Sequence, residues 1–254
     1  MHEQFTTNVI NLKSYSISEA DKIILMYSKE KGLIKGVAKG IKKTTSKLGG
    51  RMDMLVANKL MLNKGKNLDT ICQAEALNTF LNLRRDMNKL FYAMYAGEIV
   101  ANFGTENDPN SEEIYNLFYA FLDKISKVEK KEHIMLSLLR FQLKIMDITG
   151  YSIELNNCVK CLKHHSEEEM YFSVENGGVL CSDCASNIIH KIKIPQKIIE
   201  FLQVLLKEDF FAETKYDNLA NEKVCDICIN LLKKYIEYYS PKKFKTLEML
   251  EVIR

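Results

Sequence analysis

Along the first 80 of the chain's 254 residues, apolar positions alternate with polar ones, which is the pattern of half-buried β-strands. Turn-like stretches, such as residues 30–32 and 63–66, separate the alternating runs. Five strands are therefore predicted, at residues 6–17, 22–28, 33–38, 54–62 and 68–76. Five short strands in so short a segment indicate a small barrel or sandwich, and we place this domain at residues 1–78.

From about position 75 the apolar residues recur at steps of three and four, which is the spacing of a buried helix face. Ser111, followed by two glutamates, is a typical helix start, and Gly150 is a typical stop. The predicted helices cover residues 77–104, as one helix or two, then 111–125, 131–149, 195–206 and 216–239. They form a helical domain at residues 79–254, which makes the fold class α+β.

Four cysteines carry the most specific motif of the chain. Cys158 and Cys161 form one C-x2-C pair, and Cys181 and Cys184 form a second pair after 19 intervening residues. This spacing is typical of a four-thiolate zinc site, because a tight turn aims both sulfurs of a pair at one ion. A strand at 171–174, a turn at 175–178 and a second strand entering Cys181 predict a zinc-ribbon-like hairpin, within an element at residues 155–186.

The number of ligands decides what such a metal does. Four thiolates fill a tetrahedral zinc and leave no position for water or substrate, so one structural Zn²⁺ per chain is predicted. Redox-active disulfides and an all-sulfur iron site are the alternatives. His164 and His165 lie between the two pairs, and with four cysteines available we expect them to be exposed loop residues.

The other cysteines give weaker signals. Cys225 and Cys228 form a third pair in the middle of a predicted helix, where Cys228 falls in an apolar stripe. We interpret Cys228 as a small core residue and place Cys225 in the core or on the helix surface. Cys72, alone in a predicted strand, is also expected in the core.

Charge is uneven along the chain. The formal net charge is +3, but residues 1–80 hold 13 basic and 7 acidic side chains. The Lys-rich stretch 39–50 lies between the third and fourth strands, where a five-stranded oligonucleotide-binding (OB) barrel would carry an exposed loop. A cluster of cations attracts polyanions such as DNA, whereas a merely solvated loop is the alternative. The candidate phosphate-binding residues are Lys35, Lys39, Lys42, Lys43, Lys47 and Arg51.

Several absences narrow the function. The sequence contains no phosphate-binding P-loop and no HExxH, GxSxG or GxGxxG motif, and nothing nominates a nucleophile or an acid–base pair, so we expect no enzyme. It also has no apolar run of membrane-spanning length and no signal-peptide pattern at its start. We therefore expect a cytoplasmic protein without membrane association.

Taken in order, these features resemble the RecO family of bacterial recombination mediators. The resemblance rests on residues 18–21 between the first two strands, on 32–40 leading into 41–46, and on 177–181 in the zinc segment. The order of OB-like barrel, Lys-rich loop, helices, four-cysteine hairpin and helices makes it specific, and it covers essentially the whole chain.

The resemblance implies a function. RecO-like proteins bind single- and double-stranded DNA, anneal complementary strands and work with RecR to load RecA on DNA covered by single-strand-binding protein, whose acidic C-terminal tail they recognise. For that tail, the helices offer Arg84, Arg85, Arg140 and Lys144. The family also implies association with the nucleoid.

The few aromatic residues of the first domain affect how such a protein would bind DNA, and two other functions remain as alternatives. Phe5, Tyr15 and Tyr27 are the only aromatic residues before Phe80, so we expect phosphate contacts to dominate DNA affinity. Two other hypotheses stay open: a zinc-ribbon adaptor for protein interactions or transcription, whose basic loop only aids solubility, and a thiol-redox enzyme that uses a C-x2-C pair.

Overall fold

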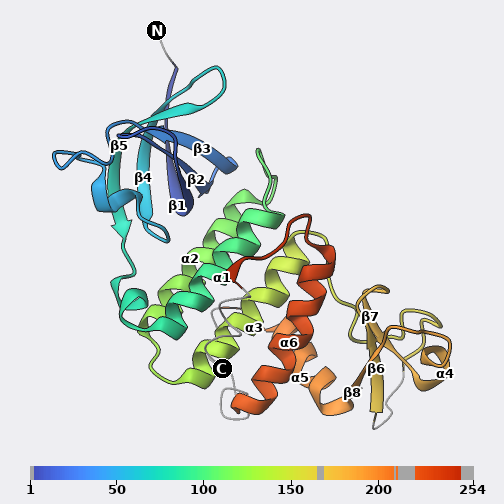
Figure 1. Cartoon of the computed structure of the whole chain (residues 1–254). Coiled ribbons are helices and arrows are strands. Elements are labelled where there is room, and N and C mark those ends of the chain that lie inside the picture. Colours follow the sequence, from blue (N-terminus) through green and yellow to red (C-terminus); the bar gives the residue numbers. More distant parts are fainter. Residues whose placement is uncertain (1–2, 165–168, 209, 211–220, 247–254) are drawn as a thin grey trace. The chain divides into compact units, whose positions relative to one another are not determined.

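The computed structural model of the chain describes residues 3–164, 169–208, 210 and 221–246 (Figure 1). Its contacts divide these residues into two compact units. Unit 1 comprises the residues up to Lys127 together with 244–246, and unit 2 comprises Val128–Lys243. Across the described residues, no helix has the length and apolar character needed to cross a membrane.

Unit 1 is built on a closed five-stranded barrel in the order β1-β2-β3-β5-β4 (Figure 1). Strands β3 and β5 pair in parallel, and the other neighbours pair antiparallel. The predicted OB-like barrel is therefore confirmed, and all five predicted strands are present. Their bounds are β1 (Gln4–Ser16), β2 (Lys22–Ser28), β3 (Gly32–Ala38), β4 (Ala57–Asn63) and β5 (Asp69–Asn78).

The barrel core is filled by alternate strand residues such as Val9, Ile24 and Leu60, all of which are fully buried. Leu48 and Met52 join this core from the segment between β3 and β4, which contains the short 3-10 helix η1 (Gly49–Met52). The segment between β3 and β4 is thus attached to the barrel by its own apolar residues.

The sequence places the first helix too early. Residues 75–78 continue strand β5, η2 (Leu81–Arg85) follows, and α1 (Met87–Phe103) begins about ten residues after the predicted start. The apolar residues in between do not share one helix face, since Leu77 is 45% exposed on β5. Asp86 sets the true start, because its side chain accepts hydrogen bonds from the first backbone N–H groups of α1.

Cys72 is also placed wrongly by the sequence. It lies on β5 next to the buried Ile71, and successive side chains of a strand point to opposite faces. Because Ile71 faces the barrel core, the Cys72 thiol is exposed on the outer face.

Helix α2 (Ser111–Lys127) completes the helical part of unit 1 and packs on α1. The domain boundary that the sequence predicts after residue 78 coincides with the end of β5. The contacts, however, group α1 and α2 with the barrel.

In unit 2, α3 (Lys131–Ile148), α5 (Gln196–Lys207) and α6 (Glu222–Tyr239) pack together. A three-stranded sheet in the order β7-β6-β8 accompanies them (Figure 1). Its elements are β6 (Glu169–Ser173), β7 (Gly178–Leu180) and β8 (Ile192–Pro195), with the short helix α4 (Ser182–Ala185) after β7. Strand β8 was not predicted, and the predicted start of the last helix, at 216–220, lies outside the described residues.

The third cysteine pair belongs to the core of unit 2. Cys225 and Cys228 are both fully buried on α6. Burial raises the pKa of Cys225 to about 11 and that of Cys228 to about 12, with further contributions from nearby carboxylates and from Cys225, respectively. Their burial confirms Cys228 as a core residue and places Cys225 in the core as well, rather than on the helix surface.

A buried carboxylate ties distant parts of unit 1 together. Glu98 on α1 is 2% exposed, and its Oε1 lies 2.9 Å from Nζ of Lys13 on β1. Its Oε2 accepts hydrogen bonds from the backbone N–H groups of Lys245 and Thr246 and from the Thr246 hydroxyl, at 2.7–3.0 Å. Burial alone would raise the pKa of Glu98, but these hydrogen bonds and Lys13 outweigh it and lower the pKa.

Glu98→Gln tests this arrangement, because it keeps the shape and removes the charge. We expect the free energy of unfolding at neutral pH to fall by about 1–3 kcal/mol, the value of hydrogen bonds to a charged group. A carboxylate whose pKa is lower in the folded state stabilises above its unfolded pKa of about 4.3, and that contribution is lost as the pH falls through the folded pKa. Urea unfolding followed by circular dichroism at several pH values measures both effects.

The matched control is Glu75→Gln, which alters an exposed carboxylate on β5. It should leave stability unchanged within about 0.5 kcal/mol. An equal loss in both variants, or a Glu98→Gln defect that persists undiminished in acid, would contradict the role of the charge.

Candidate metal centre and nucleic-acid interface

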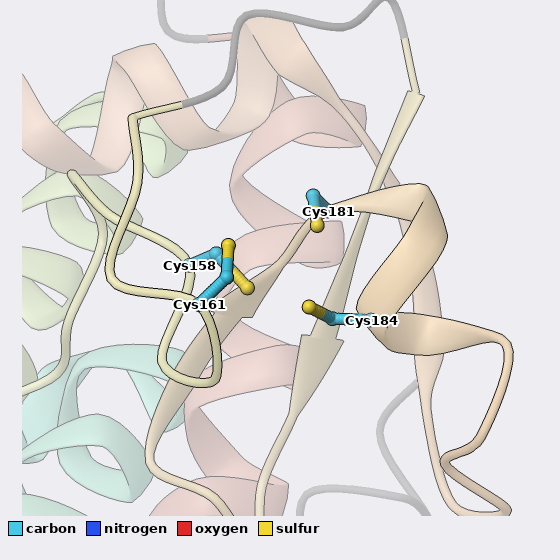
Figure 2. Close-up of side chains that lie close together, drawn as sticks. All are labelled: Cys158, Cys161, Cys181 and Cys184. Atoms are coloured by element: carbon cyan, nitrogen blue, oxygen red, sulfur yellow. The ribbon is translucent and has the colours of Figure 1, made fainter.

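The structure brings the four predicted cysteines together. The sulfur atoms of Cys158, Cys161, Cys181 and Cys184 all lie within 4.8 Å of one another, and Figure 2 shows them pointing toward a common centre. Zn–S bonds of about 2.3 Å in a tetrahedron require sulfur separations of roughly 3.8 Å. The cluster is therefore close to the dimensions of a four-thiolate zinc site, and the donor set fits this metal.

The first pair sits on a tight turn. The backbone N–H of Leu162 donates to the carbonyl oxygen of Cys158 at 2.8 Å, and the Cys158 N–H donates to the Lys163 carbonyl at 3.0 Å. Leu162 has a φ of +61°, a left-handed conformation that is uncommon for a residue other than Gly. This turn places both sulfurs of the pair on the same side of the loop.

The second pair follows the hairpin that the sequence predicts. Gly177 takes a φ of +82° at the turn, and a Cβ on Gly178 would lie 2.3 Å from the Glu154 carbonyl oxygen. This close approach lets β7 run beside the first pair, where the Val159 N–H donates to the Val179 carbonyl at 2.9 Å. Cys181 then precedes α4, which carries Cys184.

Burial and neighbouring groups shift the pKa values of Cys158, Cys181 and Cys184 in different directions. Burial opposes ionisation of Cys158, but backbone N–H groups, first that of Cys161, outweigh it and lower its pKa to about 6. The pKa of Cys184 is raised to about 12, first by its hydrogen bond with Cys181 and then by burial. Burial also raises the pKa of Cys181. A divalent cation removes this conflict, because each thiolate then faces a positive charge.

Of the two histidines between the pairs, His164 is described by the structure, and it does not join the cluster. His164 is exposed, and its Nδ1 lies 2.9 Å from the carbonyl oxygen of Asn156. His165 lies outside the described residues. Across those residues, the four cysteines form the single group of three or more His, Cys, Asp or Glu side chains that is placed to bind a metal.

All six predicted phosphate-binding side chains are exposed on unit 1. Lys35 lies on β3, and the other five lie in the segment from Lys39 to Arg51, which we call the basic loop. The loop begins at fixed positions, because the Gly40 N–H donates to Asp21 Oδ1 at 2.7 Å and the Lys42 N–H donates to the Ala20 carbonyl at 3.0 Å.

Two buried asparagines, which the sequence analysis missed, hold the other end of the loop. The side-chain N–H groups of Asn11 and Asn58 donate to the backbone carbonyl of Arg51, at 2.8 and 2.7 Å. Both asparagines are at most 1% exposed. Their signal in the sequence is a polar residue at an inward position of an otherwise apolar strand, which requires a hydrogen-bond partner.

The cations of the basic loop and Lys35 have no carboxylate partner within 4 Å among the described residues. Nearby lysines differ, since Lys29 pairs with Glu112 at 3.0 Å and Lys31 lies 3.6 Å from the ring centroid of Phe5. Within the loop, Lys42 Nζ donates to the Ser18 carbonyl and the Arg51 guanidinium to the Lys47 carbonyl. These contacts orient the side chains, and no carboxylate of residues 3–164, 169–208, 210 or 221–246 forms an ion pair with them.

Comparisons with known proteins agree with this architecture. Residues 1–80 match the family model described as the N-terminal part of recombination protein O, and residues 84–248 match the model of its C-terminal part. The chain is 33% identical over 248 residues to a DNA repair protein RecO of Desulforamulus reducens, covering 97% of this chain and 94% of that protein.

Two more relatives carry the same name. The RecO protein of Gloeobacter violaceus is 28% identical over 246 residues, with 96% of this chain and 91% of the relative covered. That of Pelotomaculum thermopropionicum is 27% identical over 248 residues, with 97% and 93% covered. With both family models matched in order, this chain belongs to the RecO family, and its role lies in DNA repair and recombination.

Proposed function

We propose that this protein is a non-enzymatic mediator that binds single- and double-stranded DNA and anneals complementary strands. The observation that carries the proposal is the set of exposed cations on unit 1 without carboxylate partners among the described residues: Lys35, Lys39, Lys42, Lys43, Lys47 and Arg51. Each phosphate that a fixed cation neutralises releases condensed counterions, which favours binding without reading of sequence.

Annealing follows from the same charges. Pairing of complementary strands is already favourable, and mutual repulsion of two polyanions slows their encounter. A loop held by Asp21, Asn11 and Asn58 presents its cations in a fixed arrangement. Two strands bound there lose part of their repulsion, so pairing can nucleate without ATP and without a catalytic residue.

We further propose that Cys158, Cys161, Cys181 and Cys184 hold one structural Zn²⁺. The ion would stabilise the fold of residues 155–186, where two short strands and one turn of helix provide little core of their own. A closed four-sulfur site has no free position for substrate, which is consistent with a protein without catalytic activity. Metal content together with thiol titration separates this proposal from a redox-active disulfide.

As partners we propose RecR, RecA indirectly, and the acidic tail of single-strand-binding protein, in the cytoplasm at the nucleoid. Support for these partners comes from the family. For the tail, Arg84 and Arg85 are exposed. Arg140 is 1% exposed and pairs with Glu208 at 3.2 Å, and Lys144 donates to the Leu206 carbonyl, so these two side chains already have partners inside unit 2.

A second function, an adaptor that contacts proteins through the zinc element, has one specific observation in its favour. Leu162 in that element is 77% exposed, and Ile189, three residues after the end of the element, is 90% exposed. Two such apolar side chains give a small contact surface. A protein that bound there would not need the basic loop. DNA binding that depends on the loop therefore distinguishes the two functions.

Replacing Lys39, Lys42 and Lys43 by Ala tests the DNA site. We expect weaker binding to unrelated sequences by similar factors, and a salt slope for single strands that falls by about 0.7 for each lost phosphate contact. Fluorescence anisotropy of labelled oligonucleotides across a salt series measures both quantities. The matched control replaces Lys207, Lys223 and Lys234, three exposed lysines of unit 2, and an identical loss in both variants would reject the assignment.

Replacing Cys158 or Cys181 by Ser tests the metal site. Zinc content should fall below about one ion per chain, and protease cleavage within residues 155–186 should become faster, because three ligands hold the metal more weakly. DNA binding should fall less than in the lysine variant. Cys72→Ser, at an exposed thiol, is the control, and full zinc retention in a chain lacking all four ligand cysteines would contradict the site.

Annealing should need no nucleotide and should slow as salt rises, because the Debye length contracts from about 10 to about 3 Å between 0.1 and 1 M. Two complementary oligonucleotides carrying a donor and an acceptor dye report duplex formation with and without ATP and magnesium. The lysine variant should anneal several-fold more slowly than the control variant. A rate that requires ATP, or that ignores both salt and the loop charges, would overturn the mechanism.

A further inference from the structure

An apolar strip crosses the outer face of the barrel on strands β1, β2 and β3. In the strand register Tyr15 is opposite Ile23, and Ile23 is opposite Val37. Directly opposed residues point to the same face of a sheet. Because Ile24, the neighbour of Ile23, lies in the barrel core, the three side chains point outward.

The strip is accessible at its Tyr15 end. Tyr15 is 51% exposed, whereas Ile23 and Val37 are partly exposed. The other two aromatic residues of the barrel are already occupied, since Tyr27 is fully buried and the Phe5 ring is covered by the Lys31 ammonium. Tyr15 is thus the aromatic side chain among the three that can offer a ring face to a ligand.

Cations border the strip on two sides. Lys35 lies two residues before Val37 on β3, so its exposed side chain shares the outer face. At the other end, Ile17, 50% exposed, begins the turn that joins β1 to β2. That turn is bound to the basic loop through Lys42, whose Nζ donates to the Ser18 carbonyl at 2.8 Å and whose N–H donates to the Ala20 carbonyl.

Apolar surface beside fixed cations suits a ligand that combines flat rings with a charged backbone. Single-stranded nucleic acid has both, because its bases have free faces and its phosphates alternate with them. In a duplex the base faces are already stacked on each other, so they cannot stack on the strip. A duplex then gains only the phosphate contacts of the basic loop. The arrangement therefore separates two contributions, charge from the loop and stacking from the strip.

We propose that Tyr15, with Ile17, Ile23 and Val37, forms a base-stacking subsite that makes this protein prefer single-stranded over double-stranded DNA. This inference rests on the proposed function, since it requires a protein that binds single-stranded DNA. Bases stack on the Tyr15 ring while phosphates contact Lys35 and the loop. The subsite is indifferent to sequence, because every base presents a ring face.

The test compares Tyr15→Ala with Tyr15→Phe in the full chain, with Tyr238→Ala on α6, 56% exposed, as the matched control. The probes are a labelled oligothymidine, a duplex of equal length, and a strand of abasic tetrahydrofuran units that keeps the phosphates without the bases. Tyr15→Ala should weaken oligothymidine binding by about 5- to 150-fold, the range for loss of one stacked base. Its affinity for the duplex and the abasic strand should change less than about twofold, and its salt slope should be unchanged.

Tyr15→Phe and Tyr238→Ala should bind oligothymidine like the wild type. Ile17→Ser, an independent change at the end of the strip, should shift affinity in the same direction as Tyr15→Ala. Unchanged oligothymidine binding by Tyr15→Ala, or an equal loss on the abasic strand or the duplex, would overturn the stacking subsite. So would an equal loss with Tyr238→Ala.

The outcome is distinguishable from failure of the proposed function. If the Lys39, Lys42 and Lys43 variant keeps its affinity and salt slope while Tyr15→Ala loses affinity, the loop assignment fails and the subsite stands. If only the lysine variant is affected, the subsite fails and the loop stands. A wild-type chain that binds none of the probes overturns both.

Discussion

Five like charges within thirteen residues repel one another, and anchoring the loop that carries them is the constraint on which the proposed DNA interface depends. Leu48 and Met52 bury their side chains in the barrel, while the side chains of Asn11 and Asn58 donate hydrogen bonds to the Arg51 carbonyl. None of these four side chains is charged, and the acidic anchor, Asp21, accepts from the Gly40 backbone N–H rather than from a cation of the loop. The barrel can therefore hold the loop without neutralising its charges.

The same separation of tasks applies on the barrel surface. Strand register directs Lys35 and Val37 to one face and the core residues to the other, so charge and apolar surface occupy neighbouring outward positions. In unit 2 the four-cysteine element has the donor set of a metal site. The raised pKa values of Cys181 and Cys184 disfavour their thiolates, and the Zn²⁺ that we propose there would offset this.

The sequence predicted the strands and the clustering of the four cysteines well, because alternation of apolar residues and cysteine spacing are local signals. It failed where a longer-range contact decides. Residues 77–81 have helix-like apolar spacing, yet pairing with β4 keeps β5 extended through Asn78. The sequence also placed Cys72 in the core, because the alternation does not say whether Ile71 or Cys72 faces inward. In the structure Ile71 faces the core, so Cys72 is exposed.

Other features had weak or no local signals. The hydrogen bonds from Asn11 and Asn58 span 40 and 7 residues, and the pairing of Arg140 with Glu208 spans 68. Strand β8 has only four residues and gains its conformation by pairing with β6. Arg140, among apolar helix residues, suggested a surface binding site, but its guanidinium pairs with the Glu208 carboxylate within unit 2.

Glu98 has a consequence for how the protein is made. Its carboxylate binds Lys13, from the first strand, and Thr246, which is synthesised after all of unit 2. During translation the barrel and its first two helices emerge early, with Glu98 buried beside Lys13 but lacking three of its hydrogen bonds. Unit 1 is therefore completed only after the ribosome has delivered residues 244–246, so a nascent chain that stalls within unit 2 carries an unfinished barrel unit.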